Sequence, residues 1–331
     1  MKYVSLLILA IAVAVLPSLA QKNKAVPVIF DSDMAPDYDD VGAIAILNAF
    51  ADKGEAKILA TIASCIHPNV AATFSVFNTY FKRPGIPVGI PKGYTVNMSD
   101  RQHWTDSIIT AYPHALATNA AAEDAVKLYR RTLAAQPDGS VTIVTVGFLT
   151  NLYELLRTGA DEYSPLSGMQ LVKQKVKQLV SMAGAFPSGF EFNVIKHKEA
   201  SKYVFDHWPT PVILSGFEIG KKIKTGLPLV ANASIRHSAV KDVFRISIPL
   251  DPNDAEGRMS WDETAVLVAV RGYAPFYTLQ RGRMVVSETD GFNTWIDDDS
   301  GPHFYLVEKL PPANVQKVIN DLMMHQPGGR K

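Results

Sequence analysis

Five carboxylates fall within ten consecutive residues, in the segment Asp31-Ser-Asp33-Met-Ala-Pro-Asp37-Tyr-Asp39-Asp40. The apolar residues 25–30 precede this segment and predict a buried strand, and the apolar residues 41–50 after it predict a buried helix. The acidic residues therefore lie between the carboxyl end of a strand and the start of a helix. Open α/β sheets bind their ligands at this position.

The acidic segment needs a source of positive charge. Asp39 and Asp40 can interact with the positive end of the helix, but that dipole stabilises each charge by only about 0.3–1 kcal/mol. A bound divalent cation would offset the repulsion better, and hard oxygen ligands favour calcium or magnesium. A solvated acidic loop is the alternative, against which the flanking apolar segments argue. An EF-hand is excluded, because Pro36 and Gly42 stand where that loop requires Gly and Glu.

The N-terminus has the pattern of an export signal. Residues 1–20 predict a secretory signal peptide, with Lys2 in the positive region, a mostly apolar run over 4–16, and a small-x-small cleavage site at Ser18-Leu-Ala20. A retained N-terminal anchor is the alternative, although the run is short for a membrane span. After cleavage, residues 21–331 would form one domain without membrane attachment, either periplasmic or secreted.

Charge and cysteine content argue against attraction to nucleic acid and exclude an internal disulfide. The 331 residues include 33 basic and 32 acidic side chains, and loss of Lys2 with the leader would make the two numbers equal. No basic excess is available to attract nucleic acid. Cys65 is the only cysteine, so the chain cannot form an internal disulfide, and we interpret Cys65 as a small buried apolar residue.

Short β-branched runs alternate with helix-like segments. The runs predict strands at residues 58–63, 86–90, 141–146, 176–182 and 211–215, with helices at 74–81, 121–135 and from 150 onward. This alternation predicts an open α/β sheet, mainly parallel and flanked by helices. Residues 91–120 and 221–258 have less apolar periodicity. We interpret them as segments that rim a site or as ordinary surface excursions.

Four motifs occur in a fixed order along the chain. They are the Asp-rich segment 31–40, Thr145-Val-Gly-Phe-Leu-Thr-Asn151, Phe190-Glu-Phe-Asn193 and Trp261-Asp-Glu-Thr-Ala-Val266. Together they resemble the inosine-uridine-preferring nucleoside hydrolase family, from about Val28 to the helix after Asp262. The resemblance implies a Rossmann-like fold with a calcium ion at the floor of a pocket. In that family, a water bound to calcium attacks the anomeric carbon of a ribonucleoside and releases the base and free ribose.

The resemblance also implies a set of calcium ligands. Asp33 would be both a calcium ligand and the general base, and Asp40 would be a second, bidentate ligand. Asp262 would be a third ligand and could also hold a ribose hydroxyl. The family uses a backbone carbonyl at the position of Val146, so the identity of that side chain need not matter. Such a base typically contributes about 10²–10⁴-fold to the rate.

The sugar ligands follow from the same resemblance. Asp39 would bind the ribose 2′-hydroxyl, and Glu191 and Asn193 would bind hydroxyls at the far end of the sugar. Asp31 is expected to orient the loop from behind the ligands. Asp37 belongs to a slightly longer version of the loop and receives no role.

The base side of the site departs from the family pattern. Many members have a histidine immediately before the last calcium-binding Asp, where it protonates the leaving base, but this chain has Trp261. A purine-preferring branch of the family also has Trp there, and Trp261 can stack on a purine. The alternative for Trp261 is core packing. A sandwich would need a second aromatic residue, for which Trp104 and Phe186 are candidates.

Two further departures leave the general acid unassigned. Lys196-His197 stands where the family usually has an acidic residue after Asn193, and the segment around His67 replaces a region that commonly presents a sugar-contacting Asn. His67 could protonate a leaving base, but a single loop histidine is more often structural or solvated.

Three functions remain open from the sequence. The first is an exported, calcium-dependent ribonucleoside hydrolase for nucleoside salvage, possessing a purine preference and acting on small-molecule nucleosides. The second is a hydrolase of another N-ribosyl compound or related N-glycoside. The third is a non-catalytic nucleoside- or sugar-binding protein, against which the intact Asp33, Asp39, Asp40 and Asp262 argue. Homo-oligomers are common in the resembled family, but no segment marks an interface.

Overall fold

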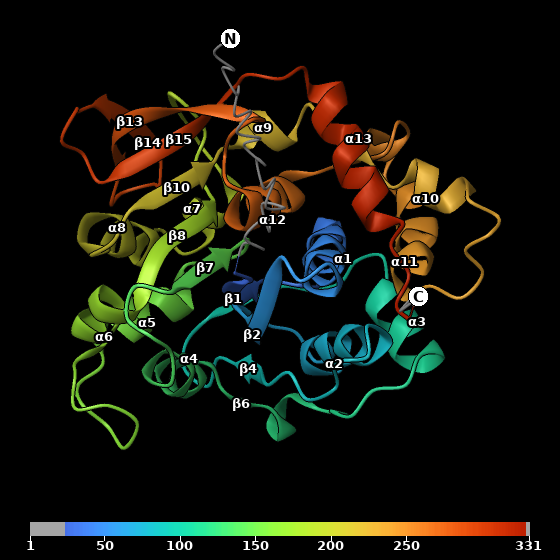
Figure 1. The fold of residues 1–331 in the computed structure, drawn as a ribbon, viewed down its shortest axis with the longest axis horizontal. Coiled ribbons are helices and arrows are strands. Elements are labelled where there is room, and N and C mark those ends of the chain that lie inside the picture. The colour runs from blue at the N-terminus through green and yellow to red at the C-terminus, as the bar shows by residue number, and fades with distance from the viewer. Residues whose placement is uncertain (1–23, 329–331) are drawn as a thin grey trace, which may run out of the picture.

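An eleven-stranded sheet runs through the centre of the molecule (Figure 1). In spatial order its strands are β6 (Glu123–Asp124), β4 (Val88–Ile90), β2 (Ala56–Ala63), β1 (Val26–Ser32), β7 (Val141–Thr145), β8 (Val176–Met182), β10 (Val212–Ser215), β15 (His303–Glu308), β13 (Tyr277–Val286), β14 (Asn293–Asp297) and β9 (Ser188–Gly189). The strands from β6 to β15 pair in parallel, and β13, β14 and β9 continue the sheet in antiparallel pairing. The predicted open, mainly parallel α/β sheet is confirmed.

The computed structural model describes residues 24–328. The predicted signal peptide over residues 1–20 lies outside these described residues. Within them, no helix combines the length and the apolar character that a membrane span requires.

Helices cover both faces of the sheet (Figure 1). They are α1 (Asp39–Asp52), α2 (Val70–Tyr80), α3 (Trp104–Ala111), α4 (Ala125–Ala134), α5 (Thr150–Arg157), α6 (Gly168–Lys175), α7 (Phe192–Lys196), α8 (Lys198–His207), α9 (Phe217–Gly220), α10 (Leu227–Ala231), α11 (Ala239–Ser247), α12 (Trp261–Arg271) and α13 (Pro312–Met323). Two short ribbons join distant loops: β3 (Cys65–Ile66) pairs with β5 (Val96–Asn97), and β11 (Lys224–Thr225) pairs with β12 (Arg258–Met259).

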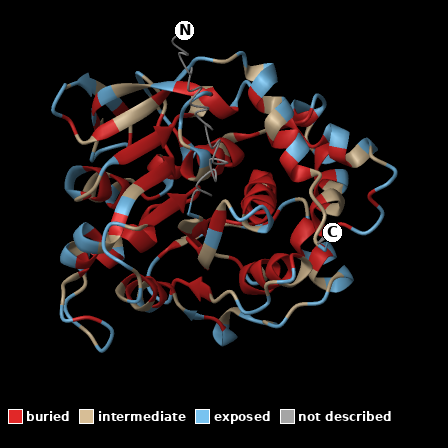
Figure 2. Cartoon of the chain, viewed as in Figure 1, coloured by how far each residue is buried: buried red, intermediate tan, exposed pale blue. Residues whose placement is uncertain are grey.

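Two apolar cores lie on opposite faces of the sheet. Val28 and Phe30 of β1 belong to one core, whereas Ile29 between them belongs to the other. This alternation follows from the two-residue period of a strand. The first core includes α1, α2, α11, α12 and α13, and the second includes α4, α5, α6 and α8. Figure 2 shows the central strands and α1 as largely buried. The apolar run after Asp40 therefore forms a helix enclosed on most sides.

The structure differs from the predicted elements in the two segments of weak periodicity. Residues 91–120 contain α3, and residues 221–258 contain α10 and α11, so neither segment is irregular throughout. Ser238 caps α11 by accepting a hydrogen bond from the backbone N–H of Lys241. The antiparallel edge strands were also not predicted, because strand and helix alternation carries no signal for a terminal meander.

Candidate active site

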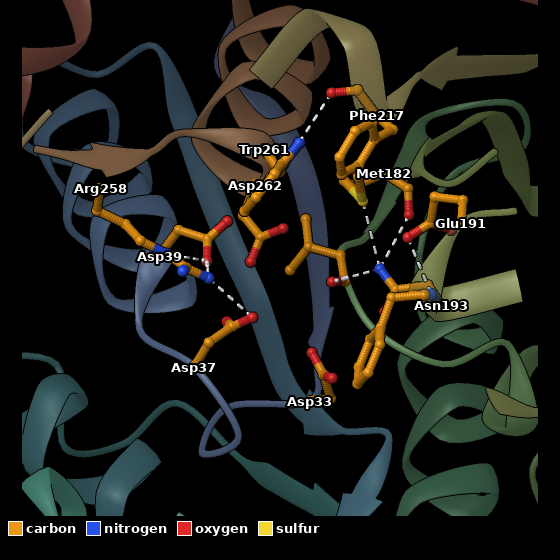
Figure 3. A pocket seen from close by; sticks show the side chains of 12 residues that line it. Asp33, Asp37, Asp39, Met182, Glu191, Asn193, Phe217, Arg258, Trp261 and Asp262 are labelled. Atoms are coloured by element: carbon orange, nitrogen blue, oxygen red, sulfur yellow. Dashed lines mark hydrogen bonds and ion pairs between the residues drawn. The ribbon is translucent and has the colours of Figure 1, made fainter. Parts of the chain in front are cut away.

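A pocket of about 260 Å³ opens at the carboxyl ends of the central parallel strands (Figure 3). Its wall combines the loops after β1, β7 and β8 with the beginnings of α7, α9 and α12. It is lined by Asp33, Asp37, Asp39, Val146, Met182, Glu191, Phe192, Asn193, Phe217, Arg258, Trp261 and Asp262. Of the eight residues predicted for the site, all line this pocket except Asp40, which is fully buried at the start of α1. The structure therefore brings four distant motifs to one place.

Asp31 supports the loop from behind the pocket. Its Oδ2 accepts hydrogen bonds from the Tyr129 hydroxyl at 2.8 Å and from Asn151 Nδ2 at 3.0 Å. Asn151 Nδ2 also donates to the carbonyl of Ala63 at 2.7 Å, so the end of β2 is tied to the same group. Burial raises the pKa of Asp31 to about 7, against the lowering effect of these hydrogen bonds. This geometry suits an orienting role for Asp31.

Asp40 has an oxygen that no described residue satisfies. The Ser32 hydroxyl donates to Asp40 Oδ1, but Asp40 Oδ2 is buried and has no hydrogen-bond partner within residues 24–328. Burial raises the pKa of Asp40 well above its usual range, and the neighbouring charges of Asp33 and Asp39 raise it further. An orphaned buried carboxylate oxygen is costly in a protein interior, and a cation would satisfy it.

The other acidic groups show the same effect. Burial raises the pKa of Asp262 and of Asp33 well above the usual range, and the charges of neighbouring aspartates add to both shifts. Carboxylate oxygens of Asp37, Asp39 and Asp40 lie within 4.8 Å of one another. These donors are all hard oxygens, so the acidic cluster fits a hard metal ion.

Arg258 enters the acidic cluster from β12 and was not predicted. Its Nε and Nη2 donate to Asp39 Oδ1 at 3.0 and 2.7 Å, and Nη2 lies 2.8 Å from Asp37 Oδ2. Burial raises the pKa of Asp39 to about 7, whereas the guanidinium lowers it. The only advance signal for Arg258 was general, since a buried group of acids requires a basic partner. No local pattern marked this particular arginine.

Asn193 and Glu191 are bound to the backbone around them. Asn193 Nδ2 donates to the carbonyls of Val146 and Met182, each at 3.1 Å. Glu191 caps α7, and its carboxylate accepts from the backbone N–H groups of Asn193 at 2.9 Å and of Val194 and Gly184 at 3.2 Å. Burial raises the pKa of Glu191 to about 7 despite these bonds. Both side chains therefore line the pocket and also hold the backbone around it in place.

Trp261 contacts Phe217 on one side and Arg258 on the other. Its indole N–H donates to the carbonyl of Phe217 at 2.8 Å, and the two rings stack with centroids 5.3 Å apart. The Arg258 guanidinium lies 5.2 Å from the indole centroid, and Figure 3 shows Trp261 between Arg258 and Phe217. Trp104 is instead fully buried in the core, and Phe186 stacks on Tyr305.

Two other aromatic residues, Phe217 and Phe192, line the pocket beside Trp261, and neither Trp104 nor Phe186 lines it. Phe217 was not predicted, because it begins the short helix α9 just after β10, where no motif marks it. His67 does not line the pocket; its Nδ1 accepts a hydrogen bond from the backbone N–H of Asn69 at 3.2 Å.

Solved structures share this fold across nearly their whole length. An inosine-uridine preferring nucleoside hydrolase from Bacillus anthracis matches with a TM-score of 0.69 and 17% identity, covering 90% of this chain and 99% of that one. A purine-preferring ribonucleoside hydrolase from Gardnerella vaginalis matches with a TM-score of 0.69, 16% identity and the same coverage. A type III effector protein complexed with adenosine diphosphate ribose matches with a TM-score of 0.67 and 14% identity, covering 91% and 93%.

The sequence itself settles the family. No curated protein matches the chain significantly. The profile of the inosine-uridine preferring nucleoside hydrolases, however, matches residues 28–320, which include all four motifs and every residue that lines the pocket. The chain therefore belongs to the inosine-uridine preferring nucleoside hydrolase family, the N-glycosidases that hydrolyse the bond between base and ribose in ribonucleosides.

Proposed function

We propose that this nucleoside hydrolase depends on calcium and prefers purine nucleosides. The observation that carries the calcium proposal is the buried Asp40 Oδ2, which has no partner among the described residues. Asp33, Asp40, Asp262 and the carbonyl of Val146 would hold the ion. Three carboxylates and a carbonyl form an oxygen ligand set suited to calcium.

The reaction joins a water oxygen to the anomeric carbon C1′ and breaks the bond from C1′ to the base nitrogen. The water loses a proton, and the departing base takes the electron pair and a proton. Calcium, when bound, would keep these carboxylates ionised and make the attacking water easier to deprotonate. Asp33 accepts the proton of the water. The remaining carboxylates of the pocket stabilise the positive charge that develops on the sugar.

The aromatic side of the pocket supports a purine preference. Trp261 and Phe217 together present a broad apolar wall, which suits a large aromatic base better than a small one. A purine-preferring relative has the same fold. No histidine lines the pocket within the described residues, so the leaving base takes its proton from another source.

A second candidate substrate is another N-ribosyl compound. The residues that we propose for calcium and sugar binding are present in the sequence, whereas the base side differs from the family pattern at Trp261. One structure with this fold is a complex with adenosine diphosphate ribose, so the fold accommodates a ribosylated ligand larger than a nucleoside. We also propose, from the leader-like residues 1–20, that the enzyme is exported and serves purine salvage outside the cytoplasm.

Ribose release from a panel of purine and pyrimidine nucleosides tests this function. The assay is run with added calcium and again with excess chelator, and calcium restoration serves as the control. We expect release that the chelator abolishes and calcium restores, with purines cleaved faster. Calcium binding without release from any nucleoside would instead favour another N-glycoside or a binding role, and pyrimidines cleaved faster would overturn the base preference.

A further inference from the structure

Arg258 is anchored before it reaches the pocket. It belongs to the two-residue strand β12, in which it pairs with Thr225 of β11. Gly257 precedes it with a φ of +107°, and a Cβ at that position would lie 2.6 Å from the carbonyl of Thr225. This close approach fixes the backbone from which the side chain extends. The guanidinium is buried and lies 5.0 Å from the ring centroid of Tyr38, so aromatic contact restrains it further.

The hydrogen bonds of Arg258 select one oxygen of Asp39. Both Nε and Nη2 donate to Oδ1, at 3.0 and 2.7 Å. Figure 3 shows the other oxygen of Asp39 pointing away from Arg258 and toward Asp262. Two charge-assisted bonds from a planar fork hold a carboxylate in one orientation, which a single ammonium group does less well. Asp39 is itself buried, so no solvent competes strongly for these bonds.

Arg258 also restrains the loop that leads to Asp39. Its Nη2 lies 2.8 Å from Asp37 Oδ2, and its Nη1 lies 3.6 Å from Asp254 Oδ2. Asp254 in turn accepts a hydrogen bond from the Tyr38 hydroxyl at 2.6 Å. The residues on both sides of Tyr38 are thus tied to one guanidinium, and the carboxylate of Asp39 can neither rotate nor shift without breaking several bonds.

We propose that Arg258 is a positioning residue that aims the second oxygen of Asp39 at the sugar and thereby sets the preference for ribose over 2-deoxyribose. This inference rests on the proposed function, in which Asp39 receives the 2′-hydroxyl. A carboxylate oxygen held in place accepts a hydrogen bond from that hydroxyl, and a deoxy sugar leaves it without a partner. A site built to bond a hydroxyl discriminates strongly against the analogue that lacks it.

Arg258→Lys tests the proposal, because lysine keeps the charge but loses the fork. The matched control is Arg130→Lys. Arg130 is also a buried arginine that donates two hydrogen bonds to one aspartate, Asp161, but it lies outside the pocket. The measurement is kcat/KM for inosine and for 2′-deoxyinosine, with melting temperatures for each protein. We expect Arg258→Lys to lower the ratio of kcat/KM for inosine to kcat/KM for 2′-deoxyinosine about 10- to 100-fold. Arg130→Lys should leave this ratio unchanged.

Adding Asp39→Asn completes a double-mutant cycle. In the Asp39→Asn background, Arg258→Lys should change the ratio no further, because both changes remove the same contact. Equal fractional losses for inosine and 2′-deoxyinosine in Arg258→Lys would overturn the proposal and leave Arg258 a purely structural residue. A similar fall of the ratio in Arg130→Lys would do the same.

A binding measurement separates this proposal from the proposed function. Titration calorimetry with D-ribose and 2-deoxy-D-ribose, in buffer with calcium, reports the sugar preference without turnover. We expect the wild type to bind ribose more tightly and Arg258→Lys to lose that difference, even if no nucleoside is hydrolysed. No ribose preference in the wild type, or an unchanged preference in Arg258→Lys, would overturn the inference whatever the hydrolysis assay shows.

Discussion

Gly147 marks the closest approach between two strand ends of the site, and its replacement by alanine should damage catalysis. A Cβ at residue 147 would lie 2.4 Å from the backbone nitrogen of Asp33, 2.4 Å from the Ser64 hydroxyl oxygen and 2.9 Å from Asp33 Cβ. The φ angle of Gly147 is not positive, so the expected effect is steric and not one of backbone conformation. The Ser64 hydroxyl also accepts from the backbone N–H of Phe148 at 3.0 Å, which limits its freedom to move.

The structure sets the size of the displacement. Ordinary contacts of a Cβ begin at 3.4 Å, so Gly147→Ala requires the backbone of Asp33 or the strand end at residue 147 to shift by about 1 Å. Overpacking of this kind costs about 1–3 kcal/mol of stability. A misplacement of about 1 Å at a reacting group costs about 10²-fold in rate. We therefore expect kcat/KM for inosine to fall about 100-fold while the melting temperature falls by about 2–12 °C, at about 2–4 °C per kcal/mol.

The assay is steady-state hydrolysis of inosine, with the melting temperature measured by calorimetry on the same preparations. Gly159→Ala is the matched control, because nothing lies within 4 Å of a Cβ at that position. It should retain the activity and stability of the wild type. A Gly147→Ala enzyme with wild-type kcat/KM would refute the reasoning, since it would show that the position of Asp33 does not limit the reaction.

Three other perturbations probe separate parts of the molecule. Asp33→Ala should abolish tight calcium binding, measured by titration calorimetry, and lower kcat by at least about 10²-fold; retained turnover would exclude Asp33 as the base. Trp261→Ala should lower kcat/KM for inosine more than for a nitrophenyl riboside, whose leaving group needs less help. Equal losses of kcat/KM for the two substrates would show that Trp261 does not assist the departure of the base. Burial lowers the pKa of His303 to about 4, so the folded state favours its neutral form. The contribution of His303 to the free energy of unfolding is therefore complete above pH 6.5. It is lost as the pH falls from about 6.5 toward 4, which lowers the free energy of unfolding by up to about 3 kcal/mol. Urea unfolding should therefore show a steeper loss of stability over this range in the wild type than in His303→Gln, and parallel curves would contradict the assignment.

The central fold was predictable because its signals are local. The strands β1, β2, β7, β8 and β10 are short apolar runs that parallel pairing buries on both faces. The Asp-rich segment follows the first of them, and the other motifs lie at the carboxyl ends of later strands or at helix starts. Parallel strands bring their carboxyl ends to one edge, so the predicted site residues come together once the sheet order is known.

The parts that escaped prediction depend on long-range contacts. Arg258 meets Asp39 across 219 residues of sequence, and it arrives on a strand of only two residues. Phe217, at the start of α9 and 44 residues earlier in the chain, stacks on Trp261, whereas the equally aromatic Trp104 is buried in the core. Residue type does not decide between these environments. Tertiary packing does, and a single sequence carries no record of it.

The arrangement of charges in the pocket explains why it needs both an arginine and a cation. Arg258 lies within 4.0 Å of carboxylates of Asp37, Asp39 and Asp254, whereas Asp33, Asp40 and Asp262 have no ion pair with any basic residue between positions 24 and 328. The acids thus divide into a group neutralised by the protein and a group left without a counter-charge, and the second group is the set proposed to hold calcium. Carboxylate oxygens of Asp37 and Asp39 approach Asp40 within 4.8 Å. Without Arg258 they would be free to compete for the ion, so we expect the arginine proposed to direct Asp39 to the sugar also to hold Asp37 and Asp39 back from the proposed calcium site.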